Sequence, residues 1–275
     1  MLLAYFGHHK CACTWISDIM LNIGNDLGLK TCLTQLNVDE TISEKVHSGK
    51  IELLLSLTSP YQKAKGLSPF KAFHVIRDPR DICVSGYFSH MYSHSTEGWP
   101  GLESHRQKLK SLNKTDGLMV EIDFTSYFLE HISEWRYDDP NILEIKMEDL
   151  TRSPFDEFLR VLKFLGLYSV DKSPTSPVYG SYALYNRVIN RIGLTAYFIK
   201  QSNVSEKRLK WILHKNRFEK LAAGRRHGEE DNQSHYRKGV AGDWKNHFES
   251  VHKDYFKEKF GDLLIRLGYE KDHQW

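Results

Sequence analysis

The amino-acid sequence predicts an α/β fold in which a central, mainly parallel sheet is flanked by helices. Three observations lead to this fold class. Short apolar runs that fit buried strands alternate with longer segments whose apolar residues recur at helical spacing. A short glycine-led loop joins the first apolar run to the first helical segment. With 275 residues the chain can bury one large core, so we expect residues 1–275 to form a single domain.

The expected elements alternate along the chain. The first buried strand is Leu2–Phe6, and the amphipathic helix after it is Ile16–Leu27. Further strands are expected at Leu29–Val38, Lys50–Leu57, Phe70–Ile76 and Asn141–Met147. Further helices are expected from Arg80, over Gly117–Trp135, from an N-cap at Ser153 to Leu165, from Ser205, and over Phe248–Leu267. Because ligands bind at the carboxyl ends of parallel strands, the loop after the first strand is a candidate site.

The composition is that of an ordinary soluble globular protein, with 40% hydrophobic and 27% charged residues. The 38 basic and 35 acidic residues leave a net charge of +3, too small an excess to indicate nucleic-acid binding. No stretch approaches the ~20 apolar residues of a membrane span. The first expected strand follows Met1 directly, so we expect no signal peptide. The four cysteines all lie in the first third of the chain, which favours reduced thiols and a cytoplasmic location.

The loop Gly7–Trp15, of sequence GHHKCACTW, completes a P-loop-like strand–loop–helix unit. Backbone N–H groups and the positive end of the helix dipole converge there, which favours an anion such as phosphate, and Lys10 adds a full charge. The Walker A pattern G-x-x-x-x-G-K-[ST] is not met, because Ala12 and Cys13 replace its glycine and lysine although Thr14 fits. This departure argues against a P-loop kinase or ATPase.

A metal site is an alternative interpretation of the same loop. His8, His9, Cys11 and Cys13 are potential ligands that lie close together in the sequence. Structural zinc sites use C-x₂₋₄-C spacing with a second ligand pair elsewhere in the chain. Neighbouring histidines and a C-x-C pair cannot easily converge from one tight loop, so we expect no metal.

Three later segments carry further candidate ligand groups. Arg77–Ser85 (RDPRDICVS) has an arginine at a strand end and a serine on the helix that follows. Arg217–Glu219 (RFE) has an aromatic residue near the end of a helix, and Arg237–Phe248 (RKGVAGDWKNHF) joins two cations to a glycine. Together with the first loop, these segments resemble the cytosolic-type sulfotransferases, which use 3′-phosphoadenosine 5′-phosphosulfate (PAPS). The resemblance covers nearly the whole chain in the family's order, and its last segment is the most specific.

The resemblance implies a donor site residue by residue. His8–Trp15 matches the family's Y-P-K-S-G-T-T-W, so Lys10 is expected to be the catalytic lysine at the 5′-phosphosulfate. The amides of Cys11, Ala12 and Cys13 and the Thr14 hydroxyl are expected around this group, and Trp15 is expected to stack on adenine. The other expected donor contacts are Arg77, Ser85, Arg237, Lys238 and the Gly239 amide at the 3′-phosphate, and Phe218 and Asn216 at the adenine. The product is adenosine 3′,5′-bisphosphate (PAP), and no metal is required.

Several residues depart from the family pattern. Ala12 replaces a glycine, which is tolerable only if the backbone there avoids positive φ. Cys13 replaces a threonine and is a poorer hydrogen-bond donor, and Met147 replaces a tyrosine that contacts the donor. Glu249–Ser250 stands where the family's dimerisation pattern has Thr-Val, so we do not expect that dimer.

The largest departure concerns the general base. The family has a histidine in a K-T-H segment, and the corresponding strand here ends LSLTSP, without histidine. Either another side chain takes the proton of the acceptor, or the acceptor is acidic enough not to need a base. Candidate side chains are His90 or His94 after the helix that carries Ser85, and Asp39 or Glu40 after the second strand. We take His90 as the candidate base and Asp39 as the alternative.

The sequence therefore predicts a sulfotransferase that moves the sulfuryl group of PAPS in line to a hydroxyl or amine. The acceptor is expected to be a small molecule, a carbohydrate or a lipid, and the tyrosine-rich segment Tyr179–Tyr197 is either a lid over it or plain packing. A protein that binds PAPS or PAP without catalysis is the second hypothesis, motivated by the missing histidine. A P-loop kinase is the third.

Overall fold

The computed structural model describes residues 1–34, 39–67, 69–168 and 178–275. The chain folds into two compact units. The first unit consists of Met1–Ile76 and Glu134–Arg217, and the second consists of Arg77–Ser133 and Phe218–Trp275. Each unit is thus assembled from segments that are far apart in the sequence.

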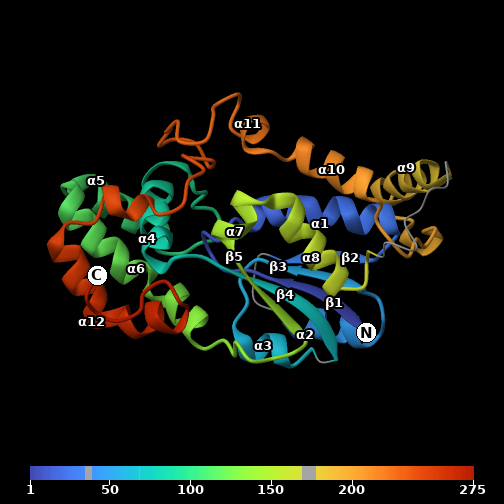
Figure 1. Cartoon of the computed structure of the whole chain (residues 1–275), viewed down its shortest axis with the longest axis horizontal. Coiled ribbons are helices and arrows are strands. Elements are labelled where there is room, and N and C mark those ends of the chain that lie inside the picture. Colours follow the sequence, from blue (N-terminus) through green and yellow to red (C-terminus); the bar gives the residue numbers. More distant parts are fainter. Residues whose placement is uncertain (35–38, 68, 169–177) are drawn as a thin grey trace. The chain divides into compact units, whose positions relative to one another are not determined.

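The first unit contains a five-stranded sheet in which all paired strands are parallel. Its strands are β1 (Leu2–Phe6), β2 (Thr31–Thr34), β3 (Leu53–Ser56), β4 (Phe70–Ile76) and β5 (Ile142–Lys146). They are ordered β2-β3-β1-β4-β5, so β1 lies at the centre of the sheet (Figure 1). The loop after β1 therefore starts between the ends of β3 and β4, where the strand order reverses. This confirms the predicted α/β class with a parallel sheet.

The strand predictions differ from the structure mainly at their boundaries. The prediction Phe70–Ile76 matches β4, whereas Leu29–Val38 and Lys50–Leu57 extend beyond β2 and β3. Residues 35–38 of the second prediction lie outside the described residues. Lys50 is excluded from β3 because its N–H donates to the carbonyl of Lys45, which closes the preceding helix.

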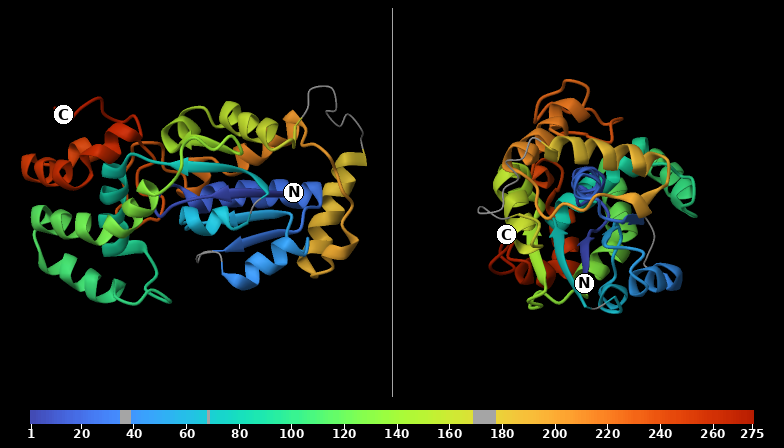
Figure 2. Two further views of the ribbon diagram at one scale, coloured as in Figure 1. Left: turned by 90° about the horizontal axis from the view of Figure 1, so that it is seen from below. Right: turned by 90° about the vertical axis from the view of Figure 1, so that its right-hand side faces the viewer.

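Helices cover both faces of the sheet (Figures 1 and 2). The helices of the first unit are α1 (Cys13–Leu27), α2 (Glu40–His47), α3 (Tyr61–Lys65), α7 (Met147–Arg152), α8 (Pro154–Phe164), α9 (Val178–Arg191) and α10 (Glu206–Lys215). Side chains of α1, α8 and α10 share one buried cluster with one face of the sheet, and side chains of α2 and α3 pack in a second cluster on the other. The alternation of strand side chains between two faces produces these two clusters.

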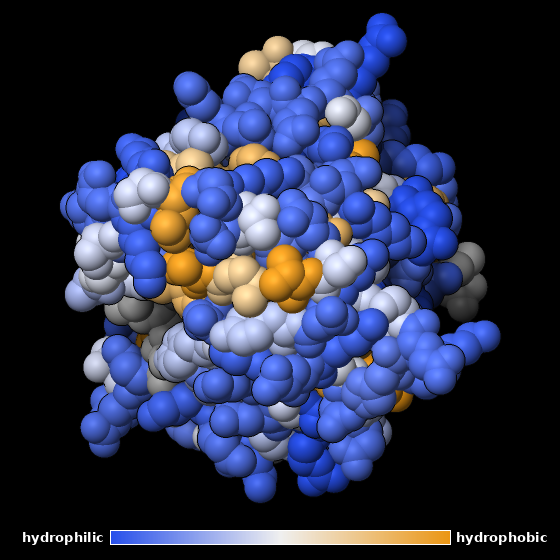
Figure 3. Space-filling view, turned by 90° about the vertical axis from the view of Figure 1, so that its left-hand side faces the viewer, coloured by the Kyte–Doolittle hydropathy of each residue, from blue (hydrophilic) through white to orange (hydrophobic). Residues whose placement is uncertain are grey.

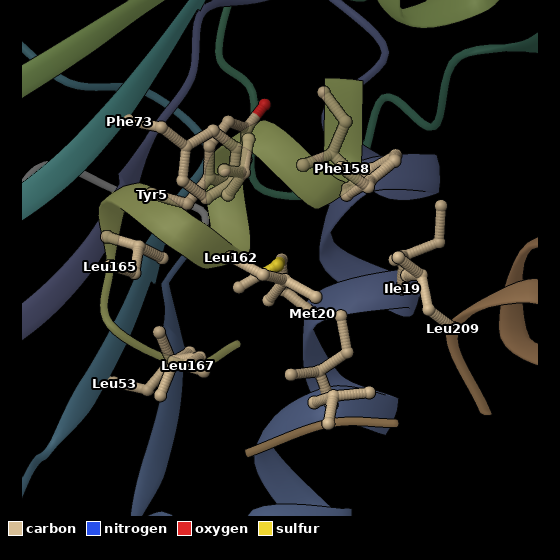
Figure 4. Packing of buried hydrophobic residues seen from close by; sticks show 14 of the residues in the cluster. Tyr5, Ile19, Met20, Leu53, Phe73, Phe158, Leu162, Leu165, Leu167 and Leu209 are labelled. Carbon is tan, nitrogen blue, oxygen red and sulfur yellow. The ribbon is translucent and has the colours of Figure 1, made fainter. Parts of the chain in front are cut away.

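The larger cluster fixes α1, and with it the loop after β1 (Figure 4). Tyr5 of β1 stacks on Phe73 of β4 with ring centroids 4.8 Å apart. Ile19 and Met20 of α1 are fully buried in the same cluster as Phe158 of α8. Burial of each side chain of this size stabilises the fold by about 1.5–3 kcal/mol. The helix that begins the candidate site thus rests on a packed core.

Two serines stand at the starts of predicted helices, and the structure gives them different roles. Ser205 accepts a hydrogen bond from the N–H of Arg208 at 3.2 Å and caps α10. Ser153 precedes α8 but its side chain makes no capping bond, and Pro154 begins the helix instead. In the segment that remained unassigned, residues 169–177 lie outside the described residues, and α9 follows them.

The second unit is built around α4 (Pro79–Phe88), which a π-helical turn, Ser89–Ser93, extends. Its other helices are α5 (Leu102–Ser111), α6 (Lys114–Ser133), α11 (Phe218–Leu221) and α12 (Ser250–Arg266). Both α4 and α12 pack against α6. The side of α5 and α12 presents a mainly hydrophilic surface, in which hydrophobic side chains gather in a short strip (Figure 3).

Two further observations bear on the cellular setting. In the described part of the chain, none of the helices combines the length and apolar character needed to cross a bilayer. The four cysteines form no disulfide with one another. The reduced state of the thiols and the cytoplasmic location stay predictions.

Candidate functional site

Gly7 makes the sharp turn after β1 possible. Its N–H donates to the carbonyl of Ser56 at 2.9 Å, which continues the sheet by one residue. A Cβ atom at this position would lie 2.5 Å from the Tyr5 hydroxyl and 2.8 Å from the Cys13 sulfur. Only glycine allows the loop to pass this close to its own strand and helix.

The loop then takes two left-handed residues before α1 begins. Lys10 and Ala12 have φ angles of 63° and 59°. The condition that Ala12 avoids positive φ is therefore not met, and its Cβ is strained where the family has glycine. No side chain caps α1, and its first turn carries no acidic residue. The N–H groups at this helix end thus suit an anion.

We expect Ala12→Gly to raise the free energy of unfolding by about 1 kcal/mol. The left-handed conformation costs alanine about 1–2 kcal/mol, and the greater freedom of glycine in the unfolded chain cancels part of the gain. Urea denaturation of both proteins measures the difference. Ala64→Gly within α3 is the matched control, because its φ is not positive, and it should lower stability. If both variants are destabilised alike, Ala12 is not strained.

Cys13 closes the loop onto the strands. Its thiol donates to the carbonyl of His8 at 2.9 Å and to that of Leu57 at 3.5 Å. Burial raises the pKa of Cys13 to about 11, so the thiol stays protonated and can donate at neutral pH. The cysteine that replaces the family's threonine thus supports the loop backbone, and the Thr14 side chain beside it is exposed.

Trp15 and Asn216 meet in the first unit although 201 positions separate them. The Trp15 Nε1–H donates to the carbonyl of Asn216 at 2.8 Å, and the Asn216 amide donates back to Ile212 of α10 at 2.9 Å. The indole also packs edge-on against Phe158 at 5.7 Å. The structure therefore brings these two predicted adenine contacts together.

The helix α9 lies away from this loop. Its Asn190 donates to Asn25 at 2.9 Å, and its Arg187 pairs with Asp26 at 3.3 Å, both in the last turn of α1. Lys10 precedes the opposite end of α1, and a helix of 15 residues is ~22 Å long. For the tyrosine-rich segment Tyr179–Tyr197, this placement argues against a lid over the loop. The exposed side chains of Tyr182, Tyr185 and Tyr197 do not support plain packing either.

The predicted 3′-phosphate residues gather in the second unit around α4. Asp81 of α4 accepts hydrogen bonds from the N–H groups of Gly242 and Trp244 at 2.6 and 2.8 Å. One helical face carries Asp81, Ser85 and Phe88, and the guanidinium of Arg237 lies 4.5 Å from the Phe88 ring. Ser85 is thus on the helix face against which the Arg237–Asn246 segment packs. Arg77, 8% exposed, lies just before this helix.

The carboxylate of Asp243 positions both cations of this segment. Lys238 donates to one of its oxygens at 2.6 Å and Arg237 to the other. Both cations also pair with Glu230. Burial alone would raise the pKa of Asp243, but hydrogen bonds from these cations and neighbouring side chains hold it far below its usual value. A guanidinium has five N–H donors and an ammonium three, so donors remain for a phosphate.

Gly239 is enclosed by aromatic side chains. Its φ is 68°, and a Cβ atom there would lie 2.6 Å from the Phe218 ring and 2.9 Å from His227. His227 bonds to the carbonyl of Gly239 at 2.7 Å and its ring lies 4.5 Å from that of Phe218. Phe218 and Gly239, both predicted donor contacts, therefore meet. Sequence reasoning missed His227 and Asp243, although Asp243 lies inside the most specific segment.

Arg80, in the first turn of α4, is buried and not a surface arginine. Its side chain is 2% exposed and pairs with Asp78 at 2.8 Å and with Glu270 at 2.5 Å. The guanidinium lies over the rings of both Trp244 and Trp275, 3.8 and 4.4 Å from their centroids, and these two rings meet edge-to-face with centroids 5.6 Å apart. It is a buried link between α4 and the C-terminal segment of the second unit.

The two candidate bases lie in different units. His90, in the π-helical turn, is fully buried, and its Nδ1 lies 2.9 Å from Glu121, whose other oxygen is 2.8 Å from His105. Asp39, in the first unit, is exposed and caps α2 by accepting the N–H of Ile42 at 2.8 Å. The role of either as a base stays a prediction.

Metal-ligand side chains also converge within the second unit. In the ranges that the structure describes, two groups have ligand atoms within 4.8 Å of one another: His90, His105 and Glu121, and Glu230, Asp243 and His247. The carboxylates of the second group are already engaged by the two cations described above. In the first loop, His8 and Cys13 bond to different partners and do not converge on one point. That no metal is needed stays a prediction.

The family model for the sulfotransferase domain matches residues 59–268 of this chain. The chain belongs to the sulfotransferase family. The match confirms the family that the sequence motifs predicted.

Relatives in mammals match at low identity. Mouse sulfotransferase 2B1 is 27% identical over 237 residues, which cover 86% of this chain. Human sulfotransferase 2A1 is 24% identical over 237 residues, which cover 85% of this chain and 68% of its own length. The chain spans 58% of the length of mouse sulfotransferase 2B1 and 60% of that of mouse sulfotransferase 2A6.

Solved structures share the fold. Mouse sulfotransferase SULT7A1 complexed with PAP has a TM-score of 0.57 at 15% identity, covering 95% of this chain and 84% of the other. Retinol dehydratase in complex with androsterone and PAP has a TM-score of 0.54 at 17% identity, covering 95% and 80%. At these identities the likeness shows the fold alone.

Proposed function

We propose that this sulfotransferase-family chain transfers the sulfuryl group of PAPS to a hydroxyl or amine and releases PAP. One observation carries the proposal most directly. In the second unit, the Arg237–Asn246 segment packs on the face of α4 that carries Ser85, through Asp81 and Phe88. Two cations, a glycine amide and a serine then suit the 3′-phosphate that distinguishes PAPS from ATP.

The first unit supplies groups suited to the 5′-phosphosulfate. The uncapped N–H groups of α1 and the Lys10 ammonium favour an oxyanion. When bound, PAPS supplies the sulfuryl group and a phosphate as its leaving group. Lys10 stabilises the negative charge that develops on that phosphate, while the loop amides orient its oxygens. The proposed adenine contact of this unit is Trp15.

The acceptor and the base belong to the same proposal. We place the acceptor among small molecules that carry an apolar body and a hydroxyl, since retinol dehydratase has been solved with androsterone and with retinol. Carbohydrate and lipid acceptors remain open, and the base is His90 or, as the alternative, Asp39. We propose that residues 1–275 act as one domain in the cytoplasm.

Donor binding tests the proposal without knowledge of the acceptor. We expect PAP to raise the melting temperature and to bind about 100-fold more tightly than 5′-AMP, which lacks the 3′-phosphate. Arg237→Ala should remove most of this preference and leave 5′-AMP binding unchanged. Isothermal titration calorimetry measures both ligands. Lys245→Ala is the matched control, because Lys245 is an exposed cation in the same segment and should keep the preference.

The same titrations separate the alternatives. Stabilisation by Mg-ATP alone would favour a P-loop kinase and contradict the proposal. Tight PAP binding without transfer to any hydroxyl or amine in a broad panel would identify a protein that binds the nucleotide without catalysis. Transfer of radiolabelled sulfate from PAPS to a panel member would support the enzyme.

A further inference from the structure

Three polar side chains of the first unit form a hydrogen-bonded chain across the sheet. His8 Nε2 lies 2.6 Å from His74 Nε2, and His74 Nδ1 lies 2.6 Å from Glu144 Oε2. His8 follows β1, His74 is in β4 and Glu144 is in β5. The register places Phe6 opposite His74 and His74 opposite Glu144, so the chain crosses neighbouring strands. It starts in the loop that contains Lys10.

The surroundings hold this chain rigidly. His8 and His74 are 1% and 0% exposed, whereas the side chain of Glu144 is 23% exposed. The indole of Trp135 stacks on His74 with centroids 3.9 Å apart, and its Nε1–H donates to the carbonyl of Ser59 at 2.7 Å. Burying an imidazole costs free energy unless its nitrogens are hydrogen-bonded. The bonds between His8, His74 and Glu144 therefore hold the two rings in this arrangement. The member nearest to solvent is Glu144.

We propose that His8 accepts the proton of the acceptor group and that His74 and Glu144 relay it outward. This inference rests on the proposed function. It supplies a base in place of the histidine that the family has in its K-T-H segment. Only His9 separates His8 from Lys10, so His8 belongs to the loop proposed to hold the sulfuryl end. Its carbonyl accepts hydrogen bonds from the N–H of Cys11 and the thiol of Cys13, which fixes its backbone.

The proton and electron balance is complete within this set. The acceptor oxygen bonds to sulfur while the bond from sulfur to the 5′-phosphate breaks, and its electron pair leaves with PAP. The acceptor proton moves to His8 Nδ1. His8 passes its Nε2 proton to His74 Nε2, and His74 passes its Nδ1 proton to the Glu144 carboxylate, which releases it to water. This requires His8 with a proton on Nε2 and His74 with a proton on Nδ1.

The acidities of the two inner groups suit a relay. Burial lowers the pKa of His74 to about 3, so the ring stays neutral and passes a proton on instead of storing it. Burial raises the pKa of Glu144 to about 8, so its carboxyl can take up and release a proton near neutral pH. A buried base without contact to water needs such a route by which its proton can reach solvent.

The test compares three variants with the wild-type protein. His8→Ala should lower kcat by about 100-fold or more at saturating donor and leave the Kd for PAP unchanged. Added imidazole should restore part of this kcat, because the substitution leaves a cavity of that shape. Glu144→Gln keeps a hydrogen bond to His74 but cannot take the proton, so kcat should fall with KM unchanged. His47→Ala, which changes an exposed histidine of α2 in the same unit, is the matched control and should keep kcat.

Several outcomes would overturn the proposal. Full kcat in His8→Ala would do so, as would a loss that His47→Ala shares and imidazole does not rescue. Imidazole rescue of His90→Ala instead would assign the base to the second unit. A wild-type protein that binds PAP but never transfers would refute the proposed function itself. Without any ligand, imidazole-nitrogen NMR above the pKa of Glu144 must show His8 protonated at Nε2 and His74 at Nδ1, and the opposite tautomers would contradict the relay.

Discussion

Lys10→Ala is expected to lower kcat by about 10³-fold while the Kd for PAP changes little. The ammonium acts on charge that develops on the leaving phosphate in the transition state, so its loss raises the barrier more than it weakens binding of the product nucleotide. Single-turnover transfer of radiolabelled sulfate measures the chemical step, and calorimetry with PAP measures binding. The alanine also preserves the left-handed backbone at this position, since alanine bears the same Cβ as lysine.

Lys63→Ala is the matched control for this experiment. Lys63 is an exposed lysine of α3 in the same unit, and its loss should leave kcat and PAP binding unchanged. Retained turnover in Lys10→Ala would remove Lys10 from the mechanism. A parallel loss of PAP binding would instead make Lys10 a binding residue.

Arg80→Ala is expected to reduce the free energy of unfolding by about 3–5 kcal/mol. The substitution leaves Asp78 and Glu270 without their shared cation, and it opens a cavity beside the Trp244 and Trp275 rings. Urea denaturation followed by tryptophan fluorescence measures the loss. Arg80→Lys keeps the charge but not the planar stack, so it should recover only part of the stability.

Arg136→Ala gives the matched comparison for a surface ion pair. Arg136 pairs with Asp138 at 2.9 Å, but the two side chains are 59% and 71% exposed. Solvent screens such a pair, so this variant should unfold like the wild-type protein. Equal stability of the Arg80 and Arg136 variants would show that the buried network contributes nothing.

Local sequence was a good guide where burial alone decides the structure. The run Phe70–Ile76 matches β4 to the residue because a fully buried strand must be apolar on both faces. It was a poorer guide at β2 and β3, where the ends depend on hydrogen bonds to other segments. The sequence does not predict the second unit. This unit begins at Arg77, directly after β4, and no segment with the composition of a linker separates the two.

The candidate site, like the fold, was only partly predictable from the sequence. Lys10, Arg237 and Lys238 could be selected from the sequence because charge beside glycine in a loop is a local pattern. The sequence could not say that Asp243 orients both cations, or that Ala12 is left-handed, because these depend on backbone angles and distant partners. Nor could it find the His8–His74–Glu144 chain, although His74 and Glu144 are the polar interruptions of two apolar strands.

By itself, the sequence determined the α/β class, the phosphate-type loop after the first strand and the family. These follow from patterns within short segments, since the period of apolar residues and the residue types of a loop act locally. Only the tertiary structure decided which polar groups meet. Arg80 packs against tryptophans 164 and 195 positions away, and His8 reaches His74 across a strand pair. Such contacts depend on strand order and helix packing, which bring together groups that no local pattern relates.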